Sequence, residues 1–347
     1  MKQNPRDFVI PACQCIVQKN GEGIIIKANR SQTRIEVKDL TFAYLRDPVL
    51  KGVNFTLEPG AVGLLGPNGS GKTTLLRCLL GQVPLVTGQI SVLGCDMARH
   101  ARLARSGLGW MPERGGIIPG VSGVGLVAYL GELSGMPARD AMQRAHEVLH
   151  YVGLADERYR KCDDYSQGMK QRLKLAQALV HDPVWLFLDE PTSGLDPQGR
   201  VSVLELIRDL AWNKGMGVIL STHLLADVEA VCNEILVLKQ GELLSRQTID
   251  TTGVDPHQVF EVEGFGNEEA FLAGLQELGA EVSVDQRLLL VTMDLSNLDG
   301  AGDGKSLTPT MGVNAILRVA ADNDYALRRL RRRPVTLAEE FYRMVEA

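Results

Sequence analysis

One segment of the sequence has the residue types and the spacing that bind a chain of phosphates. It follows the pattern G-x-x-x-x-G-K-[ST], comes after an apolar run at residues 62–65, and precedes helix-like sequence that starts at Thr74. The segment consists of Gly66, Pro67, Asn68, Gly69, Ser70, Gly71, Lys72 and Thr73. Its glycines allow successive backbone N–H groups to converge on phosphate oxygens, and the start of the helix adds a positive dipole. We therefore expect Lys72 to bridge the β- and γ-phosphates of ATP, and Thr73 and Thr74 to lie beside them, with the Thr73 hydroxyl on Mg²⁺.

Two adjacent carboxylates follow a second apolar run. Asp189 and Glu190 come directly after the apolar residues 184–188. The carboxyl ends of buried strands are where α/β sheets bind ligands. We expect Asp189 to hold Mg²⁺, and Glu190 to orient and deprotonate the attacking water. Two solvated acids at the end of a strand are the alternative, which Lys72 upstream makes the weaker one.

A histidine and a capped helix complete the candidate chemistry. His223 ends a third apolar run, residues 218–220, where a donor to the developing charge on phosphate is useful, although most lone histidines are structural. Residues 165–172 read Tyr-Ser-Gln-Gly-Met-Lys-Gln-Arg, and Ser166 is a good N-cap for a helix with an apolar stripe over 169–180.

The elements that position these residues indicate an α/β fold. The three apolar runs are typical of parallel strands covered on both faces, and helical patterns separate them. Alternation over residues 35–57 predicts half-buried antiparallel strands at the start of the domain. Residues 1–33 show no comparable pattern and are expected to be an N-terminal extension.

In the order in which they occur along the chain, the motifs resemble those of the ATP-binding subunit of ABC transporters, over residues 34–246. The set comprises Lys72, the segment around Ser166, Asp189 with Glu190, the Ser-Gly-Leu-Asp segment that ends at Asp196, and His223. The resemblance implies a P-loop NTPase core at residues 34–250. It also implies an antiparallel β-subdomain and a helical subdomain at about 114–168.

The resemblance assigns further residues to ATP. The family's signature loop, usually Leu-Ser-Gly-Gly-Gln, binds the γ-phosphate of ATP held by the other subunit. Ser166 and Gly168 match its serine and second glycine, whereas Gln167 and Met169 replace its first glycine and glutamine. Asp196 matches the aspartate of the loop that crosses the dimer interface. Tyr44 matches the aromatic residue that stacks on adenine, although packing on the β-layer explains it nearly as well.

One position departs from the commoner family pattern. A glutamine is usual after the strand-like residues 107–111, and this sequence has Glu113 there. A glutamate is similar to what part of the export-type branch carries, and it adds a third carboxylate near the metal. The apolar stretch after it, residues 115–130, covers the region that receives a membrane subunit in the family, although a loop and a helix buried within the domain would explain its composition too.

The region after residue 255 is expected to form a small α+β accessory domain, residues 256–347, beyond a linker-like stretch at 251–256. Strand-like patterns occur at 259–262, 281–284, 288–292 and 315–319, and helix-like patterns occur at 268–278 and 326–332. Thr336 has capping-box spacing for a last helix. The glycine-rich stretch 300–306 contains G-K-S one residue short of the phosphate-binding spacing, and we expect a loop there.

The resemblance implies an ATPase that dimerises head to tail, more plausibly as a homodimer. A separate integral-membrane subunit would hold it at the cytoplasmic face of the membrane, because the uncharged stretch at 115–131 has only 17 residues and contains six glycines and a proline. The region after residue 255 is similar to the accessory domain of some export-type subunits, and this resemblance favours export over import. The alternative is a soluble ATPase that remodels nucleic acid or ribosomes, but a net charge of −5 argues against a nucleic-acid partner. A small-molecule P-loop kinase would leave Ser166 and His223 unexplained.

Overall fold

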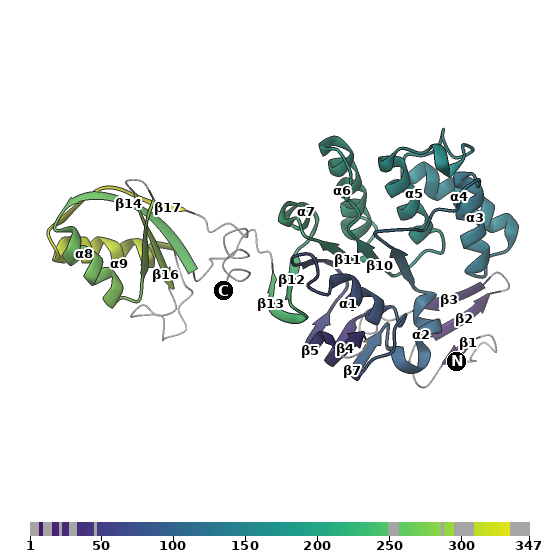
Figure 1. Cartoon of the computed structure of the whole chain (residues 1–347), viewed down its shortest axis with the longest axis horizontal. Coiled ribbons are helices and arrows are strands. Elements are labelled where there is room, and N and C mark those ends of the chain that lie inside the picture. Colours follow the sequence, from purple (N-terminus) through teal and green to yellow (C-terminus); the bar gives the residue numbers. More distant parts are fainter. Residues whose placement is uncertain are drawn as a thin grey trace, which may run out of the picture. The chain divides into compact units, whose positions relative to one another are not determined.

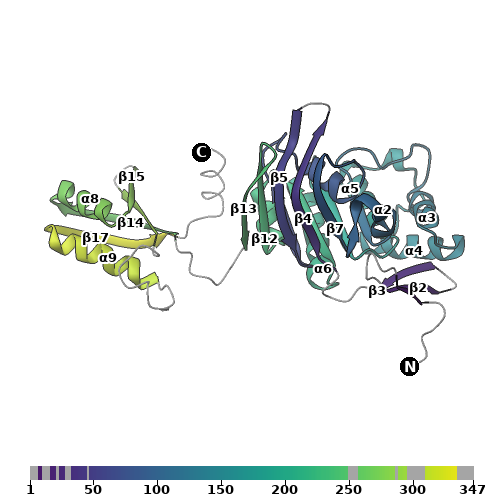
Figure 2. The same ribbon diagram turned by 90° about the horizontal axis from the view of Figure 1, so that it is seen from below.

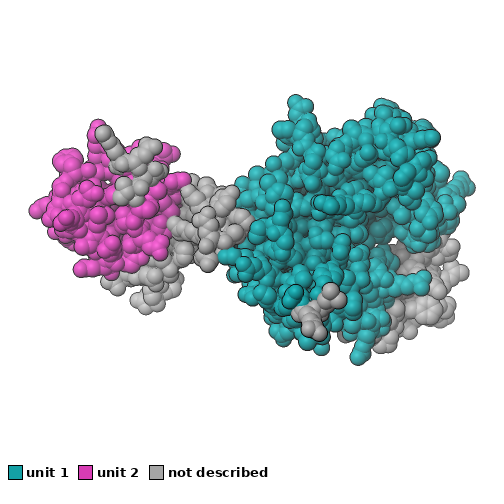
Figure 3. All heavy atoms as spheres, in the orientation of Figure 1, with its two compact units in different colours: residues 1–249 teal, residues 250–347 magenta. Residues whose placement is uncertain are grey.

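The computed structural model describes residues 7–9, 16–20, 23–27, 33–44, 47–248, 257–285, 288–294 and 309–333. The chain divides into two compact units, Met1–Ile249 and Asp250–Ala347 (Figure 3). The stretches 251–256, 300–306 and the C-terminal residues from Thr336, for which a linker, a loop and a helix are expected, lie outside the described residues.

A six-stranded sheet forms the centre of the first unit (Figure 1). Its order is β13-β12-β6-β11-β10-β9, with all neighbours parallel except β13, which is antiparallel to β12. The strands are β6 (Ala61–Leu65), β9 (Leu108–Met111), β10 (Trp185–Asp189), β11 (Gly217–Thr222), β12 (Glu234–Lys239) and β13 (Glu242–Thr248). Every residue of β6, β10 and β11 is buried, as continuous apolar runs predict for parallel strands covered on both faces.

An antiparallel sheet and several helices cover the central sheet. The second sheet, with the order β5-β4-β7-β8, contains β4 (Ile35–Tyr44), β5 (Asp47–Leu57), β7 (Thr87–Val92) and β8 (Cys95–Asp96). Helix α1 (Lys72–Leu79) contacts strands of both sheets, and their apolar side chains form one core with it. Helices α6 (Pro197–Trp212) and α7 (Leu225–Val231) pack on the other face of the central sheet (Figure 1). Helix α2 (Met97–Arg105) packs on β7 and β8.

A group of helices follows β9 and carries the segment around Ser166. Helices α3 (Gly123–Leu133) and α4 (Ala138–Tyr151) pack together, and both contact α5 (Gln167–Leu179). A single 3₁₀ turn, Cys162–Asp164, precedes α5. Near the N-terminus, β1 (Asp7–Val9), β2 (Ile16–Asn20) and β3 (Gly23–Lys27) form a small antiparallel sheet. The expected α/β fold, with its antiparallel layer and helical group, is confirmed.

The second unit has the β-α-β-β-α-β order of a ferredoxin-like fold. It contains β14 (His257–Gly266), α8 (Glu268–Glu277), β15 (Glu281–Asp285), β16 (Leu288–Asp294), α9 (Pro309–Asp322) and β17 (Tyr325–Arg333). The four strands are antiparallel, in the order β15-β16-β14-β17, and both helices lie on one face of the sheet (Figure 2). This unit has its own apolar core, as the expected α+β domain requires.

Two predictions in this unit are wrong. Residues 315–319 belong to α9, and residues 326–332 belong to β17. Leu327 and Leu330 both pack against the core although they are three positions apart in the sequence, a spacing that indicates a helix. A β-bulge in the pairing with β14 adds one residue between them, so both side chains reach the same face of the strand. Pairing with β14 therefore overrides the local pattern.

Candidate active site: a phosphate-binding cavity

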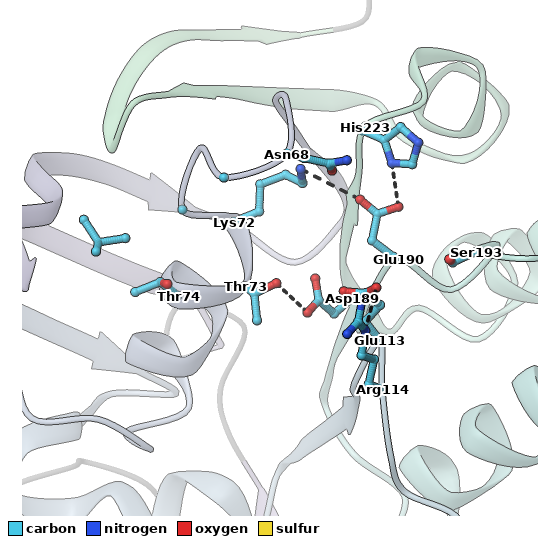
Figure 4. A pocket seen from close by; sticks show the side chains of 13 residues that line it. Asn68, Lys72, Thr73, Thr74, Glu113, Arg114, Asp189, Glu190, Ser193 and His223 are labelled. Carbon is cyan, nitrogen blue, oxygen red and sulfur yellow. Dashed lines mark hydrogen bonds and ion pairs between the residues drawn. The ribbon is translucent and has the colours of Figure 1, made fainter. Parts of the chain in front are cut away.

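A cavity of about 540 Å³ opens where β6, β10 and β11 end and α1 begins (Figure 4). Its lining brings together most of the predicted site residues of the first unit. The lining residues are Val49, Asn68, Gly69, Gly71, Lys72, Thr73, Thr74, Glu113, Arg114, Asp189, Glu190, Ser193 and His223. The cavity lies at the carboxyl edge of the parallel strands, where α/β sheets bind ligands.

The loop that connects β6 to α1 is shaped by its glycines. Gly69 and Gly71 have φ values of +82° and +106°, which side chains with a Cβ rarely adopt. A Cβ on Gly66 would lie 2.2 Å from the carbonyl oxygen of Leu238. Gly71 is the N-cap of α1 and offers no side-chain acceptor, so the first N–H groups of the helix keep their capacity to bind an anion. The Ser70 hydroxyl is buried and has no hydrogen-bond partner among the described residues.

Lys72 is buried at the start of α1 and points into the cavity (Figure 4). Its Nζ donates to the carbonyl oxygens of Gly66 at 2.7 Å and Pro67 at 3.3 Å, and it lies 3.8 Å from Glu190 Oε1. Burial lowers the pKa of Lys72, although nearby carboxylates oppose the shift. A phosphate chain in the cavity would add further negative charge beside this ammonium and accept its hydrogen bonds.

A set of oxygen ligands suitable for Mg²⁺ lies beside the lysine. Thr73 Oγ1 donates to Asp189 Oδ2 at 2.7 Å, and Ser221 Oγ donates to Asp189 Oδ1 at 3.0 Å. Burial raises the pKa of Asp189, while the two hydroxyl donors oppose that rise. Hydroxyl and carboxylate oxygens fit Mg²⁺, which binds few protein groups and keeps waters and substrate phosphates as its other ligands. Among the described residues, no group of three or more Asp, Glu, His or Cys side chains is placed to hold a metal ion without other ligands.

Glu190 and His223 form a hydrogen-bonded pair on the side of the cavity that faces Lys72 (Figure 4). Nδ1 of His223 lies 3.0 Å from Glu190 Oε2, and the Glu190 side chain is largely buried. Glu190 has a φ of +48°, an uncommon conformation for a residue with a side chain. The carboxylate therefore has one oxygen toward Lys72 and the other toward a histidine, a geometry suited to holding a water beside a phosphate.

Glu113 lies at the edge of the same cavity, in the loop after β9. Its Oε1 is 3.5 Å from Arg114 Nε, and both side chains are well exposed to solvent. Its carbonyl oxygen accepts a hydrogen bond of 2.7 Å from Nζ of Lys174 on α5. Burial lowers the pKa of this lysine, and the negative charge of Glu113 opposes the shift.

The remaining predicted residues lie outside the cavity lining. Ser166 caps α5 by accepting from the Met169 N–H at 3.3 Å, and Asp196 caps α6 by accepting from the Gly199 N–H at 3.2 Å. The side chains of Ser166 and Asp196 are exposed, as is that of Gln167. Tyr44 is 46% exposed and packs edge-on against Phe42, with the ring centroids 4.7 Å apart.

Sequence reasoning missed several residues of the cavity. Val49 comes from β5 of the antiparallel layer, and Arg114 follows directly after Glu113. Ser193 is the first residue of the Ser-Gly-Leu-Asp segment, which the sequence indicated without placing this residue in the cavity. Ser221 bonds Asp189 from the end of the neighbouring strand. A polar residue two positions before His223 at the end of an apolar run was a usable signal for Ser221, whereas nothing local indicates Val49.

Comparison with known proteins places these motifs in a family. A family model described as ABC transporter matches residues 50–193. The Linearmycin resistance ATP-binding protein LnrL of Bacillus subtilis is 32% identical over 76% of this chain and 85% of its own. The Nod factor export ATP-binding protein I of Rhizobium meliloti (strain 1021) is 35% identical over 65% of this chain and 71% of its own. A solved ATP binding subunit of an ABC transporter is 29% identical with a TM-score of 0.56, covering 63% of this chain and 91% of that one.

The match to LnrL extends beyond the phosphate loop and over most of both chains. Within the described part of the chain, no helix is long and apolar enough to cross a bilayer. The chain belongs to the family of ABC transporter ATP-binding subunits, and it is an ATPase that binds and hydrolyses ATP.

Proposed function

We propose that this subunit works as a head-to-tail homodimer with two ATP molecules at the interface, and that it drives a separate membrane subunit. In each site, the phosphate loop of one chain and the segment around Ser166 of the other enclose one ATP. The accompanying membrane subunit would keep the protein at the cytoplasmic face of the membrane.

The conformation of Gly168 is the observation that supports this proposal most directly. Its φ is not positive, and a Cβ added to it would meet nothing closer than Leu195 at 3.9 Å. Glycine within a helix is less favourable than alanine by about 1 kcal/mol, so this chain alone gives no reason for a glycine here. A ligand approaching the exposed start of α5 from outside gives such a reason, and the N-terminus of a helix suits a phosphate.

The residues of the cavity divide the work of hydrolysis among them. Lys72 and the N–H groups of α1 hold the β- and γ-phosphates, and Thr73 and Asp189 would hold Mg²⁺, which neutralises charge on the phosphates. Glu190 orients the attacking water and accepts its proton. His223 keeps the carboxylate in place and donates toward the γ-phosphate. Tyr44 is proposed to stack on adenine, because its ring is exposed at the end of β4, which pairs with the strand β5 that supplies Val49 to the cavity.

Export is the direction that we propose for transport. The names of the relatives support it, since one is a Nod factor export protein and another confers linearmycin resistance. A role on nucleic acid has less support, because Arg328 and Arg329 of β17 already face Glu263 and Glu261 of β14.

Replacing Glu190 by glutamine tests the proposed function. The amide keeps the size and the hydrogen bond to His223 but cannot accept the proton of water, so we expect turnover to fall by roughly 10²- to 10⁴-fold. ATP affinity should stay near that of the wild type. An ATP-dependent dimer should accumulate, which size-exclusion chromatography with light scattering would detect. Near-normal hydrolysis by the variant would assign the base to another residue, and a monomer with bound ATP would contradict the dimer.

A further inference from the structure

A buried carboxylate on α7 contacts three segments that surround the cavity. The Asp227 side chain is completely buried, at 0% exposure. Its Oδ2 accepts from the hydroxyls of Thr192 at 2.5 Å and Thr222 at 3.5 Å, and its Oδ1 accepts from Nε of Arg200 at 2.5 Å. A buried charge is costly unless it is paired and hydrogen-bonded, and these contacts satisfy Asp227 on both oxygens. The carboxylate is therefore held in one place.

Two of these contacts hold the backbone next to Glu190 and His223. Thr192 lies two residues after Glu190, and Thr222 comes immediately before His223. The Thr222 hydroxyl also accepts from the N–H of Leu224 at 3.0 Å, so the backbone on both sides of His223 is tied to one side chain. Glu190 itself has a positive φ, a conformation that persists only where the surroundings hold it.

The third contact reaches the loop that ends at Asp196. Arg200 lies in the first turn of α6, and its N–H donates to the carbonyl oxygen of Asp196 at 2.9 Å. The Asp196 side chain caps the same turn. Asp227 thus joins the start of α6, the segment after Glu190 and the segment before His223.

We infer that Asp227 is a positioning residue that sets the contact between Glu190 and His223 and links it to the start of α6. The inference rests on the proposed function, which assigns the activation of water to Glu190. The separation of 3.0 Å between the two side chains depends on where residues 190 and 223 place their backbones, and Asp227 is bonded beside both. A misplacement of 1 Å at a reacting centre costs about 10²-fold in rate.

The test uses Asp227→Asn, Thr192→Val and the double variant in the full chain. We expect each single variant to lower kcat by about tenfold, since each loosens the same link without removing a reacting group. The double variant should be no slower than the worse single variant, because residues that act through one contact are not additive. The Kd for a non-hydrolysable fluorescent ATP analogue should change less than about twofold, because Lys72 and its loop are untouched.

A matched control separates positioning from stability. Tyr151→Phe removes a hydrogen bond of 2.6 Å to the carboxylate of Asp209, between α4 and α6 and away from the cavity. It should lower the melting temperature without changing kcat per molecule that binds nucleotide. If Asp227→Asn does not fold, Thr192→Val and Thr222→Val still test the link, because both leave the ion pair between Asp227 and Arg200 in place.

Three results would overturn the inference: unchanged kcat in the variants, multiplicative effects in the double variant, or a loss of ATP affinity parallel to the loss of kcat. Glu190→Gln, measured alongside, shows which idea has failed. Normal turnover in Glu190→Gln would contradict the proposed function. Loss of turnover there, with normal turnover in Asp227→Asn and Thr192→Val, would contradict only the role of Asp227.

Discussion

The glycines of the phosphate loop and the glycine of the segment after Tyr165 are under different constraints. Gly66 has no room for a Cβ, and Gly71 needs a φ of +106°. Gly168 has neither constraint, and it lies at the exposed start of α5. The phosphate loop is thus shaped by contacts within the chain. The segment around Gly168 has the composition of a surface that binds a ligand from outside this chain.

The same contrast extends to the polar side chains of the two regions. Lys72, Asp189 and Glu190 are buried and already bonded to one another or to their neighbours. Ser166 and Gln167 are exposed, and the described contact of Ser166 is the cap of its own helix. In the proposed dimer, the half of each ATP site that contains Lys72 is therefore preorganised, and the half that contains Ser166 is completed by the partner's ATP.

Mixing two inactive variants tests this comparison most strongly. Lys72→Ala damages the buried half and Gly168→Asp places a negative charge in the exposed half, so each alone should lose about 10²-fold or more of the hydrolysis rate. In a mixed dimer, the phosphate loop of the Gly168→Asp chain meets the intact segment of the Lys72→Ala chain. Hydrolysis should therefore recover on mixing, as measured by phosphate release.

The control for this experiment is the stability of each variant. An acidic residue in the first turn of α5 interacts favourably with the helix dipole, so Gly168→Asp should melt no lower than the wild type. Gly168→Ala should also fold normally, because the added Cβ has space. If mixing restores no activity while both variants fold and dimerise, both halves of each site belong to one chain, and the comparison fails.

A smaller effect, on stability, is expected for Asp189 in the cavity when metal and nucleotide are absent. Burial raises the pKa of Asp189 above that of an unfolded aspartate, so folding is favoured when this group is protonated. Its contribution to stability is present below the unfolded pKa and is lost as the pH rises through the folded pKa. Without metal or nucleotide, Asp189→Asn should therefore be more stable than the wild type at pH 7.5, and the difference should disappear near pH 3. Urea unfolding at the two pH values measures it.

With Mg²⁺ and ATP present, the order should reverse, because the asparagine side chain of the variant offers no charge to the metal. The wild type should then gain more in melting temperature from Mg²⁺ and ATP than the variant. Equal stability of the two metal-free proteins at pH 7.5 would mean that Thr73 and Ser221 already compensate fully for the burial of Asp189.

The sequence was informative where structure is local. The phosphate loop, the buried strands β6, β10 and β11, and the capped start of α5 each have a signal within a few residues. Strand β17 has the spacing of a helix, because a bulge in its pairing with β14 decides which side chains face the core. Asp227 is one acid in a short helix, and its three partners lie far away in the sequence or on another element. Contacts of that kind leave no mark on a local pattern.

The smallest effect is expected at Glu113, at the edge of the buried half. Its pair with Arg114 is exposed, and such pairs contribute about 0 to 1 kcal/mol, so Glu113→Gln should leave the melting temperature almost unchanged. If Mg²⁺ binds at Thr73 and Asp189 as proposed, the charge of Glu113 would add to that of Asp189, whereas glutamine would offer only a neutral oxygen. We expect Glu113→Gln to raise the Mg²⁺ concentration for half-maximal hydrolysis by roughly threefold at equal ATP affinity.

Arg114→Gln is the matched control, because it removes the partner of Glu113 and keeps the carboxylate. Release from the arginine should strengthen the attraction of Glu113 for the metal, so this variant should need less Mg²⁺ than the wild type, opposite to Glu113→Gln. If the Mg²⁺ curves of all three proteins overlay, Glu113 faces Arg114 during turnover as well. The carboxylate would then act on the loop after β9, which Lys174 ties to α5, and the metal would depend on Thr73 and Asp189 alone.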